Sequence, residues 1–299
     1  MSGEPRSYHG QPVLKQPVWK PEVPVYFFCG GLAGASAVLA YADGDTALAR
    51  RAWATSLGAA AVSAPLLISD LGVRRRFLYM LRVFKVTSPM SVGTWILAAA
   101  SVNVGVAAVH ALSGRLAAPA RAARPVAALL GLPLSTYTAV LIAQTAVPVW
   151  RDARRMLPFV FAAGAALSAG AAATALAPPS EAGPARRLAL AGAVAEVAAM
   201  RVMERRLGAI GSPYGEGAAG ACKRAAHGLI AAGGLAVATR GRERRPAAVL
   251  GGAALLAGGL LERFAVFRAG FPSAADPAAT VGPQRERLTP RGLTPHFSR

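Results

Sequence analysis

The sequence has few residues that could hold a metal or a redox centre. Its 299 residues include only two cysteines and four histidines. Cys29 and Cys222 lie far apart and belong to no CxxC or CxxCH motif, so we expect no iron–sulfur cluster and no c-type haem in this chain. His227 is a single histidine within a predicted membrane helix, so we expect no b-type haem and no other bound metal.

Motifs of hydrolytic and nucleotide chemistry are missing too. The chain contains no P-loop, no HExxH motif, no nucleophile triad and no carboxylates at metal-ligand spacing. We therefore do not expect the chain to be an enzyme on its own.

Acidic residues are scarce. Only 14 aspartates and glutamates oppose 33 lysines and arginines, which gives a net charge of +19. Most of the cations lie between or beside apolar runs, where they fix the orientation of membrane helices and meet anionic lipid headgroups. We attribute the charge to a membrane lipid environment and expect no nucleic-acid partner.

Apolar residues dominate the rest of the chain. They make up 54% of it, and the mean hydropathy is +0.40. Several apolar runs reach about 18 residues, enough to cross a bilayer as a helix. The sequence predicts an all-α polytopic membrane protein with about eight transmembrane helices, grouped as two four-helix bundles. The expected spans are about 24–41, 53–71, 90–112, 126–149, 158–177, 188–207, 221–239 and 246–267.

The flanking segments are more polar. We expect a polar lead-in over residues 1–23 that is not a cleavable signal peptide, a transmembrane domain over 24–268 and a flexible tail over 269–299. About 22 of the 33 cations fall on the side that holds both termini. This bias predicts a multi-pass protein of the cell (inner) membrane with cytoplasmic termini.

The composition breaks most sharply in the basic stretch, Ser69–Trp95. Asp70 closes an apolar run there, and Thr87-Ser88-Pro89 signals a turn before the next run. Five cations stand between these points among aromatic and aliphatic residues: Arg74, Arg75, Arg76, Arg82 and Lys85. We interpret the basic stretch as the surface where a membrane subunit meets a partner.

Four side chains are candidates for chemistry, because ionisable and phenolic groups are costly inside a bilayer. Asp70 is either a proton relay or a helix-end residue paired with Arg74. Glu196 is a candidate for proton transfer or for a buried pair with a neighbouring helix. Glu22 is a further candidate, or a solvated acid at the interface. Tyr137 can donate a hydrogen bond to a quinone carbonyl, or lie in the bundle core with its hydroxyl satisfied.

Three stretches carry longer patterns. They are D-L-G-V-R-R-R-F-L-Y-M-L-R-V-F-K-V-T-S-P-M-S-V-G-T-W at 70–95, W-K-P-E-V-P-V-Y-F-F-C-G-G-L-A-G-A-S at 19–36 and L-P-L-S-T-Y-T-A-V-L-I-A-Q-T-A-V-P-V-W at 132–150. Together they resemble the NrfD/PsrC family, the integral membrane subunits of polysulfide reductase-type complexes. The resemblance covers the first half of the chain in the family's order and is weaker in the second half.

The resemblance implies an eight-helix, cofactor-free subunit that binds quinone or menaquinone as an exchangeable substrate. It implies two partners: a ferredoxin-like iron–sulfur subunit and the molybdopterin-type (molybdenum or tungsten) catalytic subunit that it serves. In the family the quinone pocket lies near the start of helix one and a tyrosine of helix four, which fits Tyr137. Glu22 and Tyr26 stand where some relatives carry Asn and His, so we expect these three residues to contact quinone.

The remaining candidates take supporting roles in this interpretation. We expect Asp70 and Glu196 to relay the protons that quinone reduction consumes, and the five cations of the basic stretch to dock the iron–sulfur subunit. The alternative is a subunit without redox chemistry, either a membrane anchor for the soluble subunits or a proton-translocating subunit of the same complex.

Overall fold

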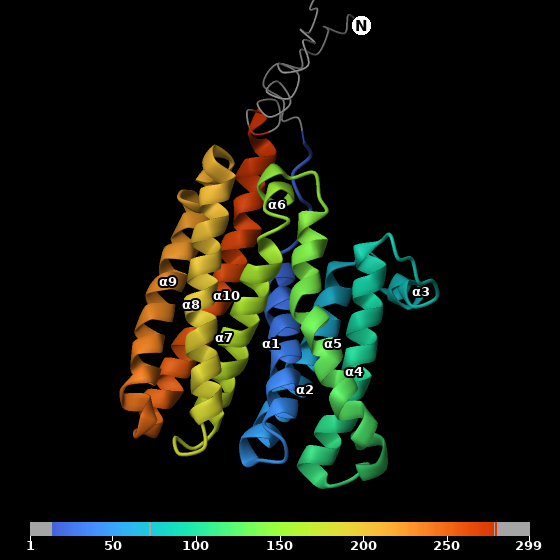
Figure 1. The fold of residues 1–299 in the computed structure, drawn as a ribbon. Helices are drawn as coiled ribbons and strands as arrows, with labels where there is room; N and C mark the ends of the chain where they lie inside the picture. The colour runs from blue at the N-terminus through green and yellow to red at the C-terminus, as the bar shows by residue number, and fades with distance from the viewer. Residues whose placement is uncertain (1–13, 72, 278, 280–299) are drawn as a thin grey trace, which may run out of the picture.

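The computed structural model describes residues 14–71, 73–277 and 279, and all of the regular secondary structure in them is helical (Figure 1). The all-α prediction is confirmed for this part of the chain. The long helices are α1 (Glu22–Ala42), α2 (Ala47–Asp70), α4 (Pro89–Ser113), α5 (Ala117–Ala143), α7 (Leu157–Leu176), α8 (Gly183–Leu207), α9 (Gly217–Ala238) and α10 (Arg245–Ala275). Shorter elements join them: η1 (Arg74–Arg76), α3 (Phe77–Met80), α6 (Pro148–Asp152), η2 (Gly208–Tyr214) and η3 (Arg240–Arg242).

Capping side chains set several helix ends. Thr46 accepts a hydrogen bond from the Ala49 amide at 3.0 Å, so α2 begins before the apolar run that predicted it. Ser88 caps α4 in the same way, and Pro89 occupies its first turn, as the turn signal predicted. Gly114, with a φ of 72°, ends α4 in the left-handed conformation.

The fourth predicted span differs most from the structure. The helix α5 begins at Ala117 and ends at Ala143, whereas the apolar run predicted about 126–149. Pro148 opens the separate short helix α6, because its fixed φ and missing amide hydrogen suit a first helical turn. Residues 117–125 are helical although they include two arginines, which shows that this helix extends beyond its apolar run.

Six of the long helices are long and apolar enough to cross a membrane: α1, α2, α4, α5, α7 and α10. The membrane class of the protein is thereby confirmed. The helices α8 and α9 have the expected positions, but their charged residues lower their hydropathy. A total of eight spans and two four-helix bundles therefore stays a prediction.

The helix α1 lies at the centre of the packing. It contacts α2 and α5 on one side and α7 and α10 on the other (Figure 1). The helix α4 packs on α5 and α2, α8 packs on α7, and α9 packs on α10. We call α1, α2, α4 and α5 the first set of helices and α7, α8, α9 and α10 the second set. The two sets meet along α1 and α7.

One end of the molecule gathers the lead-in, α6 and the end of α10 (top of Figure 1), and α3 lies lower, beside the start of α4 (right of Figure 1). Trp19 of the lead-in stacks on Trp150 of α6, with ring centroids 5.5 Å apart. Of the predicted lead-in and tail, residues 1–13 and 280–299 lie outside the described residues. The helix α10 extends to Ala275.

Small residues allow α1 and α5 to touch backbone to backbone. A Cβ on Gly131 would lie 2.5 Å from the Gly34 carbonyl oxygen, and a Cβ on Gly34 would overlap the Gly131 carbonyl. Close approach of this kind is how membrane helices associate without a hydrophobic driving force.

We predict that Gly34→Ala destabilises the protein by about 1–3 kcal/mol, because its methyl group must push the two backbones apart. Gly30→Ala, one turn earlier on the same helix, is the matched control, since a Cβ there meets nothing within 4 Å. Thermal unfolding in detergent measures both variants. Equal stability of the two variants would show that the close crossing does not limit packing.

Candidate functional site

Two of the predicted quinone residues meet inside the first set of helices. Tyr26 of α1 and Tyr137 of α5 contact each other edge to face, with ring centroids 6.4 Å apart. Both side chains are largely buried, with exposed fractions of 3% and 8%. The two stretches that sequence analysis set apart as 19–36 and 132–150 are therefore joined here.

A glycine of α4 makes room for the Tyr137 ring. A Cβ on Gly93 would overlap the Cε2 and Cδ2 atoms of Tyr137. Gly93 belongs to the 70–95 stretch, so all three patterned stretches contribute to this site. The phenol is held between α1 and α4 by packing rather than by a hydrogen bond.

Two polar atoms at this site are buried without a partner. Within the described residues, neither the Tyr137 hydroxyl nor Glu22 Oε2 has a hydrogen-bond partner. Glu22 precedes Tyr26 by four residues and so lies on the same face of α1. An unsatisfied buried polar group costs about 1–3 kcal/mol, which makes both atoms candidates for binding a polar ligand.

Asp70 lies at the end of α2, beside the start of α1. The Lys20 amide donates a hydrogen bond to Asp70 Oδ1 at 3.4 Å. Among the described residues, Asp70 forms no ion pair with Arg74. The carboxylate therefore joins the lead-in to α2, and it is half-buried at the same end of the molecule as Glu22.

Glu196 lies apart from the two tyrosines, in the second set of helices. It is fully buried on α8, and its carboxylate lies 3.4 Å from the guanidinium of Arg263 on α10. The buried-pair alternative is thus present in the structure. Sequence analysis missed Arg263 and its neighbour Glu262, although two charged residues inside the apolar run 246–267 were a visible signal.

The basic stretch forms an exposed surface. All five of its cations are exposed, and none of them forms an ion pair within the described residues. Large apolar side chains are exposed among them, including Leu78 at 67% and Phe84 at 58%. A surface that combines cations with apolar groups suits a partner protein or a lipid interface.

Two residues in the first turns of α4, Ser91 and Trp95, contact residues 83–85 of the basic stretch. Ser91 donates a hydrogen bond to the Val83 carbonyl at 3.1 Å and accepts one from the Lys85 amide at 3.0 Å. The Trp95 ring contacts Phe84 edge to face, with centroids 6.3 Å apart. Residues 83–85 of the basic stretch are therefore held against the start of α4.

A comparison with protein families agrees with these observations. The model of the NrfD-type family described as polysulfide reductase matches residues 8–275. The match confirms the resemblance of the first half and extends it over the second. No curated protein matches the chain. Among the described residues, no group of His, Cys, Asp and Glu is placed to hold a metal ion.

We predict that Ser91→Ala loosens the basic stretch. Loss of two hydrogen bonds worth about 1 kcal/mol each makes local opening roughly five- to thirty-fold more frequent. Trypsin should then cut after Arg82 or Lys85 correspondingly faster in the detergent-solubilised protein. Ser113→Ala removes a hydroxyl at the far end of α4 and is the control. Equal cleavage rates at these two sites in both variants would contradict the prediction.

Proposed function

The chain belongs to the NrfD-type polysulfide reductase family, and from this premise we propose which reaction its residues serve. Membership makes it a membrane subunit of a quinone-linked oxidoreductase. We propose that it exchanges electrons between the quinone pool and a ferredoxin-like iron–sulfur subunit, which serves a molybdopterin-type catalytic subunit. Quinone or menaquinone is its exchangeable substrate.

The observation that carries the proposal is the unpartnered Tyr137 hydroxyl. It lies in an apolar core beside Tyr26, and it has no hydrogen-bond acceptor among the described residues. A quinone headgroup needs apolar surroundings and one or two polar donors. A quinone carbonyl would give this hydroxyl the acceptor that it lacks.

Glu22 and Asp70 would supply protons at this site. Reduction of a quinone takes up as many protons as electrons, and both carboxyl groups lie at the end of the molecule where Tyr26 and Tyr137 meet. Glu22 Oε2 is buried beside the start of α1, and Asp70 is closer to the surface. In this arrangement Asp70 receives protons from water and Glu22 delivers them to the bound quinone.

The basic stretch would dock the iron–sulfur subunit. Its cations suit an acidic partner surface, which charge complementarity steers and orients. They lie at the same end of the molecule as Glu22 and Asp70, so a docked cluster would be close to the quinone. The distribution of Lys and Arg favours the cytoplasm for this end and for both termini.

The packing of α8 and α9 supports two further membrane spans. The helices α8 and α9 lie along α7 and α10, which are apolar enough to cross the membrane. Glu196 of α8 is turned inward to Arg263, away from lipid. This supports eight membrane spans, with α1, α2, α4 and α5 in one bundle and α7 to α10 in the other.

We predict that Tyr137→Phe lowers quinone-linked turnover of the intact complex roughly ten-fold. A hydrogen bond worth about 1.5 kcal/mol to the bound headgroup is lost, while the ring still fills its place beside Gly93. Turnover is measured with reduced benzyl viologen as donor and a soluble menaquinone analogue as acceptor.

Tyr41→Phe is the control for this variant, because Tyr41 is exposed at the other end of α1. Assembly of the complex should be the same in both variants. Unchanged turnover in Tyr137→Phe would instead favour a subunit that only anchors its partners.

We predict that reversing two charges of the basic stretch, Arg75→Glu with Arg76→Glu, weakens retention of the iron–sulfur subunit during purification of the complex. The loss should grow with ionic strength, since salt screens the cations that remain. Arg115→Glu with Arg121→Glu places the same change on exposed residues at the opposite end. Equal retention in the two double variants would exclude the basic stretch as the docking surface.

A further inference from the structure

Four ionisable side chains from three helices meet inside the second set of helices. They form the interior cluster: Glu196 on α8, His227 on α9, and Glu262 and Arg263 on α10. Both glutamates are fully buried, and Arg263 is 3% exposed. Arg263 Nη1 lies 3.4 Å from Glu196 Oε1, and His227 Nε2 lies 3.7 Å from Glu262 Oε2.

Arg263 is fixed in place as the positive charge of this cluster. Its Nη2 donates a hydrogen bond to the Phe161 carbonyl of α7 at 3.1 Å, and its guanidinium lies 4.2 Å from the centroid of the Phe161 ring. Gly164 leaves room for the pair, because a Cβ there would overlap both Arg263 and the Glu196 carboxylate. The helix α7 adds no ionisable side chain.

The charges of the interior cluster do not balance when both carboxyl groups are ionised. Two carboxylates face one guanidinium, which leaves one negative charge buried between the helices. A buried charge without compensation is strongly unfavourable, so the state in which one carboxyl group keeps its proton has the lower free energy. Neither carboxyl group has a hydrogen-bond partner among the described residues, but Glu196 lies 3.4 Å from the Arg263 guanidinium, whereas Glu262 pairs only with His227, at 3.7 Å. Glu262 is therefore the carboxyl group that keeps the proton.

Ionisable side chains extend from the cluster toward one end of the molecule. Toward η2, Lys223 pairs with Glu204 at 2.8 Å, and Lys223 lies one turn, about 6 Å, from His227 along α9. Toward the opposite end, the three helices carry no ionisable residue over 188–195, 228–238 and 246–261. Among the described residues of these three helices, ionisable side chains therefore lead from the cluster toward η2 and not toward the opposite end.

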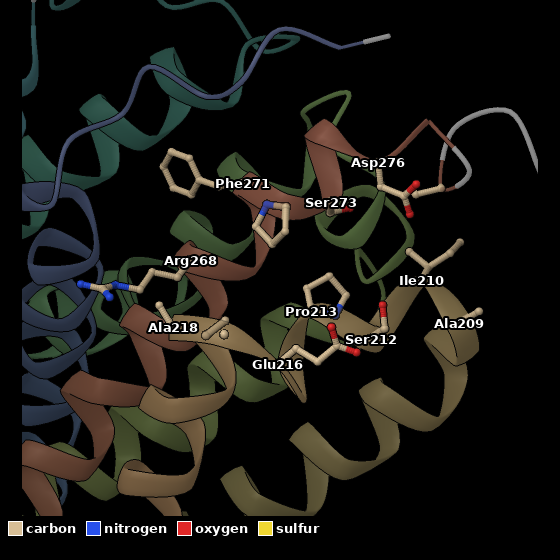
Figure 2. A pocket seen from close by; sticks show the side chains of 14 residues that line it. Ala209, Ile210, Ser212, Pro213, Glu216, Ala218, Arg268, Phe271, Ser273 and Asp276 are labelled. Carbon is tan, nitrogen blue, oxygen red and sulfur yellow. The ribbon is translucent and has the colours of Figure 1, made fainter. Parts of the chain in front are cut away.

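The η2 end is open to solvent at a hollow of about 600 Å³. Its side chains come from η2, the start of α9 and the end of α10 (Figure 2). Ser212 and Glu216 lie on one side of it, and Asp276 lies on the other (Figure 2). Water in this hollow is the nearest bulk source for the polar groups below.

Tyr214, at the end of η2, is buried and close enough to Glu262 for that charge to act on its phenol. It follows Pro213, which lines the hollow, and its buried hydroxyl has no hydrogen-bond partner among the described residues. Burial raises the pKa of the phenol, and the charges of Glu262 and Glu204 raise it further. The phenol thus stays neutral and can pass a proton by donating its own as it accepts another.

We propose that the interior cluster is a proton-binding site that holds one exchangeable proton and is loaded from the η2 end through His227. A hydronium ion protonates His227, which then transfers its Nε2 proton to Glu262 and returns to the neutral form. The 3.7 Å gap exceeds a hydrogen bond, so a bridging water or a small rotation of the imidazole completes the transfer. Glu204, Lys223, Tyr214 and Arg201 are the other groups whose charge or dipole acts on this route.

Infrared spectroscopy of the full-length chain in detergent tests the proposal without any electron transfer. A protonated carboxylic acid has a carbonyl-stretch band above the amide bands, and this band shifts in D₂O. At neutral pH we expect such a band in the unmodified protein, its loss in Glu262→Gln and its retention in Glu204→Gln, since Glu204 forms an ion pair with Lys223 at 2.8 Å. Replacement of His227 by Gln should slow the D₂O shift of the band while leaving its intensity unchanged.

Glu196→Gln covers the case in which Glu262→Gln does not fold. Loss of the Glu196 charge lets Glu262 ionise beside Arg263, so the band should also disappear in that variant. No band in the unmodified protein, or a band that survives both glutamate variants, would overturn the site. A band that vanishes on addition of sodium would identify a sodium site instead, and an unchanged exchange rate in His227→Gln would refute the route.

Discussion

The free-energy cost of placing a polar group in hydrocarbon determines where this molecule can carry polar side chains. Helices satisfy their own backbone groups, so side chains are the only polar atoms that need partners between the membrane surfaces. Most of the helical surface consists of Ala, Leu, Val and Gly, which need none. Two places, around Tyr137 and around Glu262, include buried polar atoms of phenol or carboxyl groups without a hydrogen-bond partner among the described residues.

Small residues make both places possible. Gly93 lets the Tyr137 ring lie against α4, and Gly164 lets Glu196 and Arg263 meet beside α7. The same property brings α1 and α5 into backbone contact at Gly34 and Gly131. Glycine here provides space for particular side chains, and close helix crossings hold those side chains in position.

The sequence predicted the helical class and the approximate place of every long helix, because apolar runs and capping residues are local signals. It also singled out Tyr26 and Tyr137, although only the fold could show that their rings touch. Glu262 and Arg263 were missed because adjacent opposite charges near the end of an apolar run look like the end of a span. Glu262 and Arg263 pair with His227 and Glu196, which belong to other helices. A hydropathy pattern along the chain cannot predict such pairings.

The two polar places differ in a way that separates their chemistry. The Tyr137 site has a neutral donor in an apolar core, as binding of a neutral headgroup requires. The interior cluster contains the positive charge of Arg263. This charge favours an ionised carboxylate beside it, whereas a neutral quinone headgroup gains little from it. Glu196 therefore stays paired while Glu262 exchanges its proton. Because both places face the end of the molecule that holds α6 and η2, protons for the two proposed sites would come from the same side of the membrane.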